Sequence, residues 1–292
     1  MSLVIAGGHG RVALTVSRLL AVRGERVSAV IRRPEQAGVV RDAGTRPLVA
    51  DLATASAEDL TELLTGARAV LYAAGAGLGV APGQPAPVDH DSIVTFADAA
   101  ECAGVRRFVM LSVMGADPAA RYRDNPLVET FLRARGRADE NLLSRSALAT
   151  TVIRPAWFRD RPGTGMVHLA ERTGVGDIAR EDVAAVLATL LSTDSTSPRV
   201  LELIAGTTPI HDAVARHSPP RRPAPREFRS PAPATAPREP LSAGRGGRAS
   251  DVTGSTRWCG RIVRRPLLRV GAHSATTVRS DVTCRSTQSV SS

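Results

Sequence analysis

Short, continuously apolar runs alternate with amphipathic stretches over the first 214 residues, and this alternation constrains the fold more than any other feature. Strands that are apolar along their whole length must be buried on both faces, as in parallel sheets that helices cover on either side. Because crossovers between parallel strands are right-handed, the pattern predicts a doubly wound α/β sheet of six to seven parallel strands. The predicted strands are residues 3–6, 26–31, 46–50, 69–73, 108–112, 151–154 and 200–204, and the predicted helices are residues 12–22, 34–43, 57–64, 92–103, 127–144 and 181–191.

The alternation stops after residue 214, where the composition changes. Residues 1–214 carry 23 arginines against 24 acidic residues, whereas residues 215–292 carry 15 arginines against 4, so the formal net charge of +10 belongs to the second segment. Nine of the 20 prolines also lie there, and so polar a segment cannot bury enough apolar surface to offset its ordering entropy. We therefore predict a folded domain over residues 1–214 and a disordered tail over 215–292. A nucleic-acid-binding arm is a weaker interpretation of this tail, since the tail has no stacking pattern of aromatic residues. A third interpretation is that the tail is translated from a shifted reading frame.

Composition excludes several classes of function. All 38 basic residues are arginine, which excludes Schiff-base and phosphate-loop lysine chemistry. The three cysteines have no metal-ligand or disulfide spacing, and no cluster of His, Asp or Glu indicates a metal site. No apolar run is long enough to cross a membrane, and the N-terminus does not resemble a signal peptide. We expect a cytoplasmic protein that does not bind membranes; its oligomeric state is not indicated.

A glycine-rich turn follows the first predicted strand and precedes the first predicted helix. It reads as GxxGxxA from Gly7 or as GxGxxA from Gly8, with Ala13 as the small residue. In this context glycines let the backbone approach a pyrophosphate, which free N–H groups and the helix dipole then hold. The turn therefore predicts a Rossmann-like dinucleotide site. Its cofactor-binding residues are Gly7, Gly8, His9, Gly10, Arg11 and Val12.

The end of the second predicted strand indicates which dinucleotide is bound. NAD-binding proteins place an acidic residue there, on the ribose 2′-hydroxyl, whereas this chain has Arg32 and Arg33. Guanidinium groups are suited to a 2′-phosphate, so we predict that NADP(H) is preferred over NAD(H), with Arg32 ahead of Arg33. The alternative is two solvated arginines before a helix.

Two more predicted strand ends belong to the same site, because ligands bind at the carboxyl ends of parallel strands. Asp51 and Leu52 follow the third strand, where an aspartate would accept a hydrogen bond from the adenine amino group. The alternative role of Asp51 is an N-cap of the next helix. Small residues end the fourth strand and leave room for the cofactor: Ala73, Ala74 and Gly75.

These motifs, taken in order, resemble the atypical short-chain dehydrogenase/reductase superfamily, in its NmrA-like NAD(P)-binding branch. The resemblance covers about residues 1–214 and implies a Rossmann-like domain that holds NADP(H), with a small-molecule substrate bound over the nicotinamide. It rests on residues 7–13, 31–34, 51–52, 73–75, 104–112, 154–155, 162–165 and 182–184.

The catalytic positions implied by the resemblance are only partly kept. Ser112 occupies the serine position, but Phe131 stands where the superfamily has a tyrosine and Arg135 where it has a lysine. Phenylalanine has no proton to donate, and arginine can hold ribose hydroxyls and supply charge without readily releasing a proton. Tyr122, in a loop after the fifth strand, is a weak candidate for the missing donor, and His9 is another.

We therefore predict an NADP(H)-binding oxidoreductase in which the catalytic Tyr/Lys pair is replaced. A flavin, quinone or similar planar or carbonyl acceptor would be reduced, since solvent can then protonate the product. A non-catalytic NAD(P)-binding regulator or sensor is the alternative.

Overall fold

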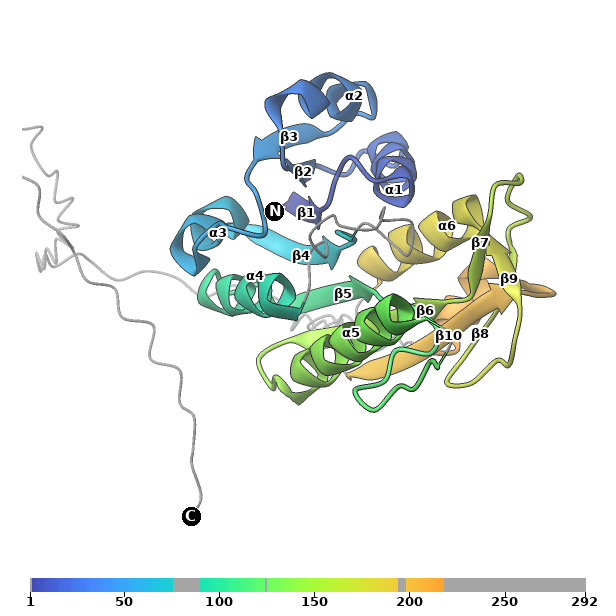
Figure 1. The fold of residues 1–292 in the computed structure, drawn as a ribbon. Coiled ribbons are helices and arrows are strands. Elements are labelled where there is room, and N and C mark those ends of the chain that lie inside the picture. The colour runs from blue at the N-terminus through green and yellow to red at the C-terminus, as the bar shows by residue number, and fades with distance from the viewer. Residues whose placement is uncertain (1, 76–89, 124, 194–197, 218–292) are drawn as a thin grey trace, which may run out of the picture. The chain divides into compact units, whose positions relative to one another are not determined.

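The computed structural model describes residues 2–75, 90–123, 125–193 and 198–217. Within this part of the chain, nine strands form one sheet in the order β11-β8-β10-β6-β5-β4-β1-β2-β3, and β7 and β9 form a small second sheet (Figure 1). The strands are β1 (Ser2–Ala6), β2 (Val27–Ile31), β3 (Arg46–Val49), β4 (Ala67–Tyr72), β5 (Arg107–Leu111), β6 (Ala149–Pro155), β7 (Trp157–Arg159), β8 (Met166–Ala170), β9 (Asp177–Ala179), β10 (Arg199–Ala205) and β11 (Thr208–Pro209). The helices are α1 (Arg11–Val22), η1 (Pro34–Gln36), α2 (Ala37–Asp42), α3 (Ala57–Leu64), α4 (His90–Cys102), α5 (Pro126–Ser144), α6 (Arg180–Leu191) and α7 (Ile210–Ala215).

Seven neighbouring strands of the large sheet pair in parallel, in the order β10-β6-β5-β4-β1-β2-β3. This confirms the predicted doubly wound sheet. All seven predicted strands are present, as β1 to β6 and β10, and all six predicted helices are present. β8 and β11 extend the edge of the sheet in the antiparallel direction.

Two apolar layers hold helices to the two faces of the sheet. On one face, α1 and α6 cover a cluster that includes Leu3, Ile5 and Val109; on the other, α3, α4 and α5 cover a cluster that includes Val4 and Val70. Adjacent residues of β1 therefore point into opposite layers, and both sets are buried. This double burial is why the strand sequences are continuously apolar.

The strand order places a ligand site at one end of the sheet. Connections from β1 lead to β2 and β3 on one side, whereas β4, β5 and β6 follow on the other side (Figure 1). The carboxyl ends of β1 and β4 thus lie side by side at the point where the winding reverses, which is where doubly wound sheets bind their ligands.

The elements that were not predicted are short or follow another pattern. β7, β9 and β11 have two or three residues each, and α7 has six. β8 alternates, with Val167 and Leu169 buried and His168 exposed, as in a strand with one face toward the core. α7 ends at Ala215, where the predicted tail begins, and residues 218–292 lie outside the described part of the chain.

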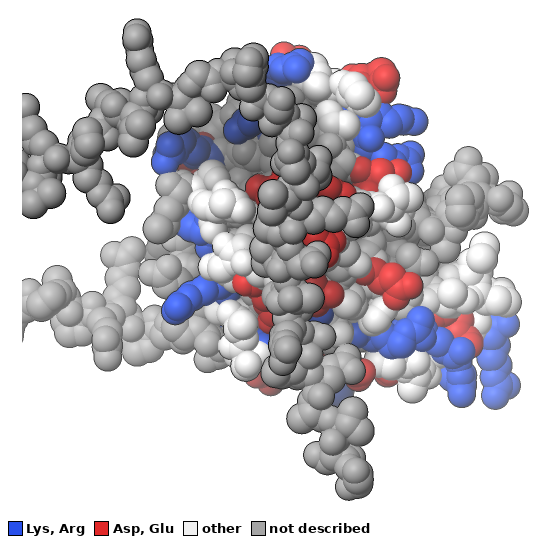
Figure 2. Space-filling view, turned by 90° about the vertical axis from the view of Figure 1, so that its left-hand side faces the viewer, with Lys and Arg blue, Asp and Glu red and all other residues white. Residues whose placement is uncertain are grey.

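Charged side chains of both signs are interspersed on the face drawn in Figure 2. This agrees with the near balance of arginines and acidic residues over residues 1–214. Among the described helices, none is long and apolar enough to span a membrane.

Candidate dinucleotide site

Gly7 and Gly8, in the turn between β1 and α1, lie so close to neighbouring strands that neither position has room for a side chain. Gly7 has a φ of 77°, and a Cβ added there would lie 2.5 Å from the Cα of Ala74. A Cβ on Gly8 would lie 2.5 Å from the Cβ of Ala29. The Gly8 N–H donates to the carbonyl oxygen of Val30 at 2.8 Å, which ties the turn to β2. Glycine is therefore required at both positions, and the backbone is open to a ligand.

Helix α1 begins directly after this turn, with Gly10 as its N-cap residue and no side-chain cap. The first N–H groups of a helix have no intrahelical acceptor and can hold an anion. The side chain of Val12 is buried in the core, so only its backbone N–H can contribute. Arg11 is exposed and forms a two-point ion pair with Asp160, at 2.9 and 3.0 Å.

A cleft of about 260 Å³ lies beside this helix end, along the carboxyl ends of β1 to β4. It brings together most of the residues that the sequence predicted for the cofactor, whereas Gly8, Arg11, Val12, Arg33 and Arg135 are not among its lining residues. The arrangement fits a nucleotide phosphate, because the glycines leave space that any Cβ would fill and the helix dipole favours negative charge. The lining residues are Gly7, His9, Gly10, Val30, Ile31, Arg32, Gln36, Ala50, Asp51, Leu52, Ala73, Ala74 and Gly75.

The end of β2 is held in place by a side chain that the sequence analysis missed. The Oε1 atom of Gln36 accepts hydrogen bonds from the backbone N–H groups of both Arg32 and Arg33, at 3.1 Å each. The side chains of both arginines are exposed, and that of Arg32 belongs to the cleft lining. A glutamine three residues after the N-cap residue Arg33, at the third position of the helical turn, is the sequence signal for such a capping interaction.

Asp51 does not cap the helix that follows it, so that alternative is wrong. The N-cap residue of α3 is Ser56, whose Oγ accepts from the backbone N–H of Asp59 at 3.1 Å. The Oδ1 atom of Asp51 instead accepts from the Ala53 N–H at 3.0 Å, in a tight turn at the cleft wall. Leu52 is buried beside it.

Arg135 lies next to Gly75, a lining residue of the cleft, and is buried with only 6% of its surface exposed. Its guanidinium donates to the carbonyl oxygens of Ala74 and Leu111, at 2.9 and 3.4 Å, and so joins the ends of β4 and β5. The Arg135 Cζ atom lies 5.6 Å from the ring centre of Phe131, one helical turn earlier. Burial lowers the pKa of the Arg135 guanidinium. Phe131 and Arg135, which the sequence resemblance aligned with a tyrosine and a lysine, thus form a cation–aromatic pair.

Ser112 follows β5, and its hydroxyl points toward α5. The hydroxyl donates to Oδ2 of Asp139 at 2.8 Å, and the Arg154 guanidinium contacts the same oxygen through Nε and Nη2, at 2.9 Å each. Asp139 is completely buried. Sequence reasoning assigned no role to Asp139 or Arg154; the available signal was an aspartate one helical turn beyond Arg135, on a face that should be apolar.

The two candidates for the missing proton donor are placed differently. His9 is exposed and lines the cleft. Tyr122 is 45% exposed in the connection between β5 and α5, where its backbone N–H donates to Glu129 at 2.8 Å.

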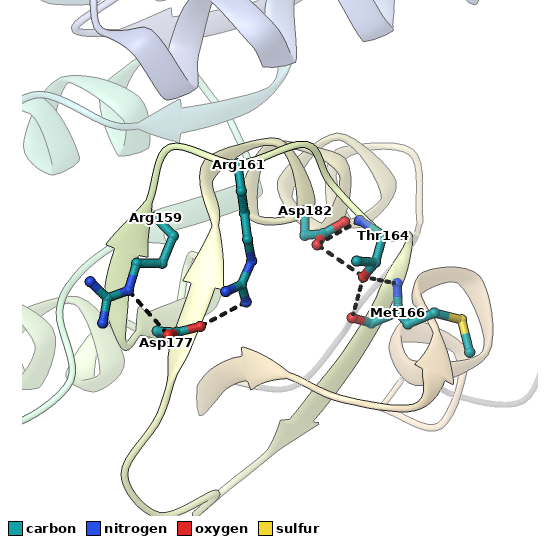
Figure 3. A network of polar contacts seen from close by, with 6 residues as sticks. All are labelled: Arg159, Arg161, Thr164, Met166, Asp177 and Asp182. Carbon is teal, nitrogen blue, oxygen red and sulfur yellow. Dashed lines mark hydrogen bonds and ion pairs between the residues drawn. The ribbon is translucent and has the colours of Figure 1, made fainter.

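Aspartates hold the segment between β7 and β9 in place (Figure 3). Asp182, in the first turn of α6, accepts from the backbone N–H groups of Thr164 and Gly165, at 3.0 and 2.8 Å. Asp177 lies between Arg159 and Arg161, at 3.1 and 2.7 Å. These contacts tie the segment to the start of α6 and to β9.

Comparison with known proteins identifies the family that shares this cleft. Residues 7–194 match the family model described as NAD(P)H-binding. The chain belongs to this NAD(P)H-binding family. The resemblance inferred from the sequence motifs is confirmed at this level, and NAD(P) is the cofactor class of the site.

Relatives of this NAD(P)H-binding protein cover the same part of the chain. It is 30% identical over 217 residues to the uncharacterized sugar epimerase YhfK of Bacillus subtilis, a match that spans 74% of this chain and all of the relative. Among solved structures, a putative NAD-dependent epimerase/dehydratase from Bacillus halodurans is 29% identical, with a TM-score of 0.66 over 74% of this chain and 99% of the other. The anaerobilin reductase ChuY from Escherichia coli O157:H7 shares the fold, with 22% identity and a TM-score of 0.59 over 70% and 97% of the two chains.

Proposed function

We propose that this protein is an NADP(H)-dependent oxidoreductase that reduces a small planar or carbonyl acceptor, such as a flavin or a quinone. The observation that carries the proposal is the position of Arg32, at the end of β2 in the lining of the cleft. Bound NADPH would supply the hydride. The cytoplasmic location expected from the sequence stays a prediction.

The preference for NADP(H) is argued from charge at the end of β2. An acidic side chain there would accept from the ribose 2′-hydroxyl and repel a 2′-phosphate. Arg32 instead offers a guanidinium, and the contacts from Gln36 fix the backbone on which Arg32 and Arg33 are carried. Among the described lining residues only Asp51 is acidic, and it follows β3.

Binding of the two cofactors to the full-length chain tests this preference. We expect NADPH to bind more tightly than NADH, and Arg32→Glu to weaken NADPH by roughly 10- to 100-fold while leaving NADH nearly unchanged, because a charge-assisted contact to phosphate is replaced by repulsion. Arg41→Glu is the matched control, since this exposed residue of α2 makes the same charge change outside the cleft lining. Equal affinity of the wild type for both cofactors would overturn the assignment.

The acceptor class is argued from the replaced catalytic pair. Phe131 offers no proton, and the Arg135 guanidinium is directed at two backbone carbonyls. Chemistry that depends on positioning more than on a tyrosine donor suits these residues. We expect NADPH consumption with at least one acceptor from a panel of flavins, quinones and aldehydes; no consumption above the rate without acceptor would contradict an oxidoreductase.

A non-catalytic NAD(P)-binding regulator is the second candidate, and the stacking of Phe131 on Arg135 favours it. It predicts cofactor binding without turnover, and a Phe131→Tyr, Arg135→Lys double variant that recovers little activity. Turnover by the wild type would rule it out.

The names of two similar proteins suggest an epimerase. The assay of NADPH consumption with flavins, quinones and aldehydes also tests that activity. Epimerisation by transient oxidation needs a base that removes a hydroxyl proton and returns it, which Phe131 cannot do. An epimerase would interconvert sugars without net consumption of NADPH, so net consumption separates the two activities.

A further inference from the structure

One buried acid has no part in cofactor binding and lies directly behind Ser112. Asp139 is completely buried on α5, with Ser112 and Arg154 both bonded to its Oδ2 atom. Its other oxygen, Oδ1, is also buried, and no described residue donates a hydrogen bond to it. A buried carboxylate oxygen without a donor is costly when the group is ionised, whereas a protonated carboxyl has fewer acceptor sites to satisfy.

The charges that surround Asp139 come from several elements. Arg154 of β6 contacts it, Arg135 lies one helical turn before it on α5, and Tyr72 of β4 interacts with Arg135. Burial raises the pKa of the Asp139 carboxyl, while Arg154 and the Ser112 hydroxyl act in the opposite direction. Burial is the largest of these effects, so the carboxyl keeps its proton to a higher pH than an exposed aspartate would.

The direction of the Ser112 hydroxyl depends on this proton. When Asp139 is ionised, it accepts the Ser112 hydrogen, as the 2.8 Å contact indicates, and Ser112 has only lone pairs to offer a ligand. When Asp139 is protonated on Oδ2, that O–H group can donate a hydrogen bond to the Ser112 oxygen across the same distance. The Ser112 hydrogen is then free to point at an acceptor molecule.

We propose that Asp139 stores the proton that Ser112 delivers to the reduced acceptor, in place of the absent tyrosine. The inference rests on the proposed oxidoreductase function. NADPH, when bound, would supply a hydride to the electrophilic carbon of the acceptor. The proton of Ser112 Oγ would go to the carbonyl oxygen, which gains the electron pair of the C=O bond. Ser112 recovers a proton from the Asp139 carboxyl, and Asp139 is left as a carboxylate paired with Arg154. After product release, solvent reloads Asp139 through the Ser112 hydroxyl, because Asp139 itself has no exposed surface.

Asp139 acts through Ser112 and is therefore a positioning residue. Its role is measured by the pH dependence of the reduction rate. With a carbonyl acceptor that the wild type reduces, we expect the rate of the hydride-transfer step to fall as pH rises through the titration of Asp139. Asp139→Asn should lower this rate roughly 100-fold or more, the usual contribution of general acid catalysis, and should remove the pH dependence. Glu140→Gln is the matched control, because this exposed neighbour on α5 changes charge in the same way and should leave rate and pH profile unchanged.

A second measurement uses no turnover. In full-length protein with ¹³C-labelled aspartate carboxyls and bound NADP⁺, we expect one resonance to titrate above the ordinary range and to disappear in Asp139→Asn. If that variant fails to fold, Ser112→Ala keeps Asp139 and should lose the pH-dependent rate while its resonance still titrates at elevated pH.

The outcomes separate the two proposals. A wild type that reduces no acceptor would overturn the oxidoreductase function and, with it, the role of Asp139. A wild type that turns over while Asp139→Asn keeps its rate and pH profile would overturn the role of Asp139 alone, as would an Asp139 resonance that shows only the ionised form from pH 5 to pH 9.

Discussion

The guanidinium of Arg11 and the carboxylate of Asp160 form a two-point ion pair that joins residues 149 positions apart in the sequence. Arg11 is the first residue of α1, beside the glycine turn, and Asp160 follows β7. Asp160 also accepts from Arg180 Nε at 2.7 Å, and these two arginines hold the pKa of its carboxyl below the usual range. A carboxylate that stays ionised therefore holds Arg11 at the start of α1.

This pair predicts competition between Asp160 and the cofactor phosphates for Arg11. Asp160→Asn should strengthen NADPH binding roughly two- to fivefold, because Arg11 is released and a like charge is removed, and Arg11→Gln should weaken it. Titration of the full-length variants at low ionic strength measures both effects, which added salt should reduce.

Asp177→Asn provides the control for this prediction. Asp177 is also held by two arginines in the same segment, but its contacts to Arg159 and Arg161 do not reach α1. Its replacement should leave NADPH affinity unchanged. Weaker binding in Asp160→Asn, or equal effects in the two aspartate variants, would argue against competition at Arg11.

The glycine turn makes a second prediction, on stability. Gly7→Ala should lower the free energy of unfolding by about 2–4 kcal/mol, because the left-handed backbone disfavours a side chain and the new Cβ would overlap Ala74. Gly66→Ala has the same φ of 77° but nothing within 4 Å, so it should cost only about 1–2 kcal/mol. Urea unfolding of both variants measures the difference; equal losses would mean that the close approach to β4 contributes nothing.

A third prediction concerns the segment that Asp182 holds. Asp182→Ala would leave the N–H groups of Thr164 and Gly165 without their acceptor, and we expect a loss of about 2–4 kcal/mol in the free energy of unfolding. Glu181→Ala, the neighbouring acid in the same helical turn, removes a single contact, to the Gly163 N–H, and should cost about 1 kcal/mol. If Glu181→Ala lowers the free energy of unfolding as much as Asp182→Ala does, the stabilisation comes from negative charge at the helix end and not from the contacts to Thr164 and Gly165.

The cofactor half of the site could be predicted because its signals are local. Gly7, Gly8 and Gly10 lie in one turn, and the residues after β2, β3 and β4 follow from the order of the strands. Once periodicity indicates parallel strands, topology brings their carboxyl ends together, so Arg32 and Asp51 reach the same cleft although they are distant in sequence from Gly7.

The contacts around Ser112 and Arg135 could not be predicted in the same way, because they join elements through side chains. Nothing in the residues around Ser112 indicates that its hydroxyl bonds to Asp139, or that Arg154 contacts the same oxygen. Arg135 was expected to hold ribose, and its bonds to the Ala74 and Leu111 carbonyl oxygens depend on how deeply α5 packs against the sheet.

The amino-acid sequence by itself determined the parallel α/β sheet, the glycine turn and the presence of Phe131 and Arg135 on α5, since hydrophobic periodicity, backbone freedom and residue identity are local properties. The tertiary structure alone decided that Arg135 is buried against Phe131, that Arg11 is held by Asp160 and that a completely buried acid lies behind Ser112. Burial and charge pairing depend on which distant elements meet, and these determine how each group can hold or release a proton.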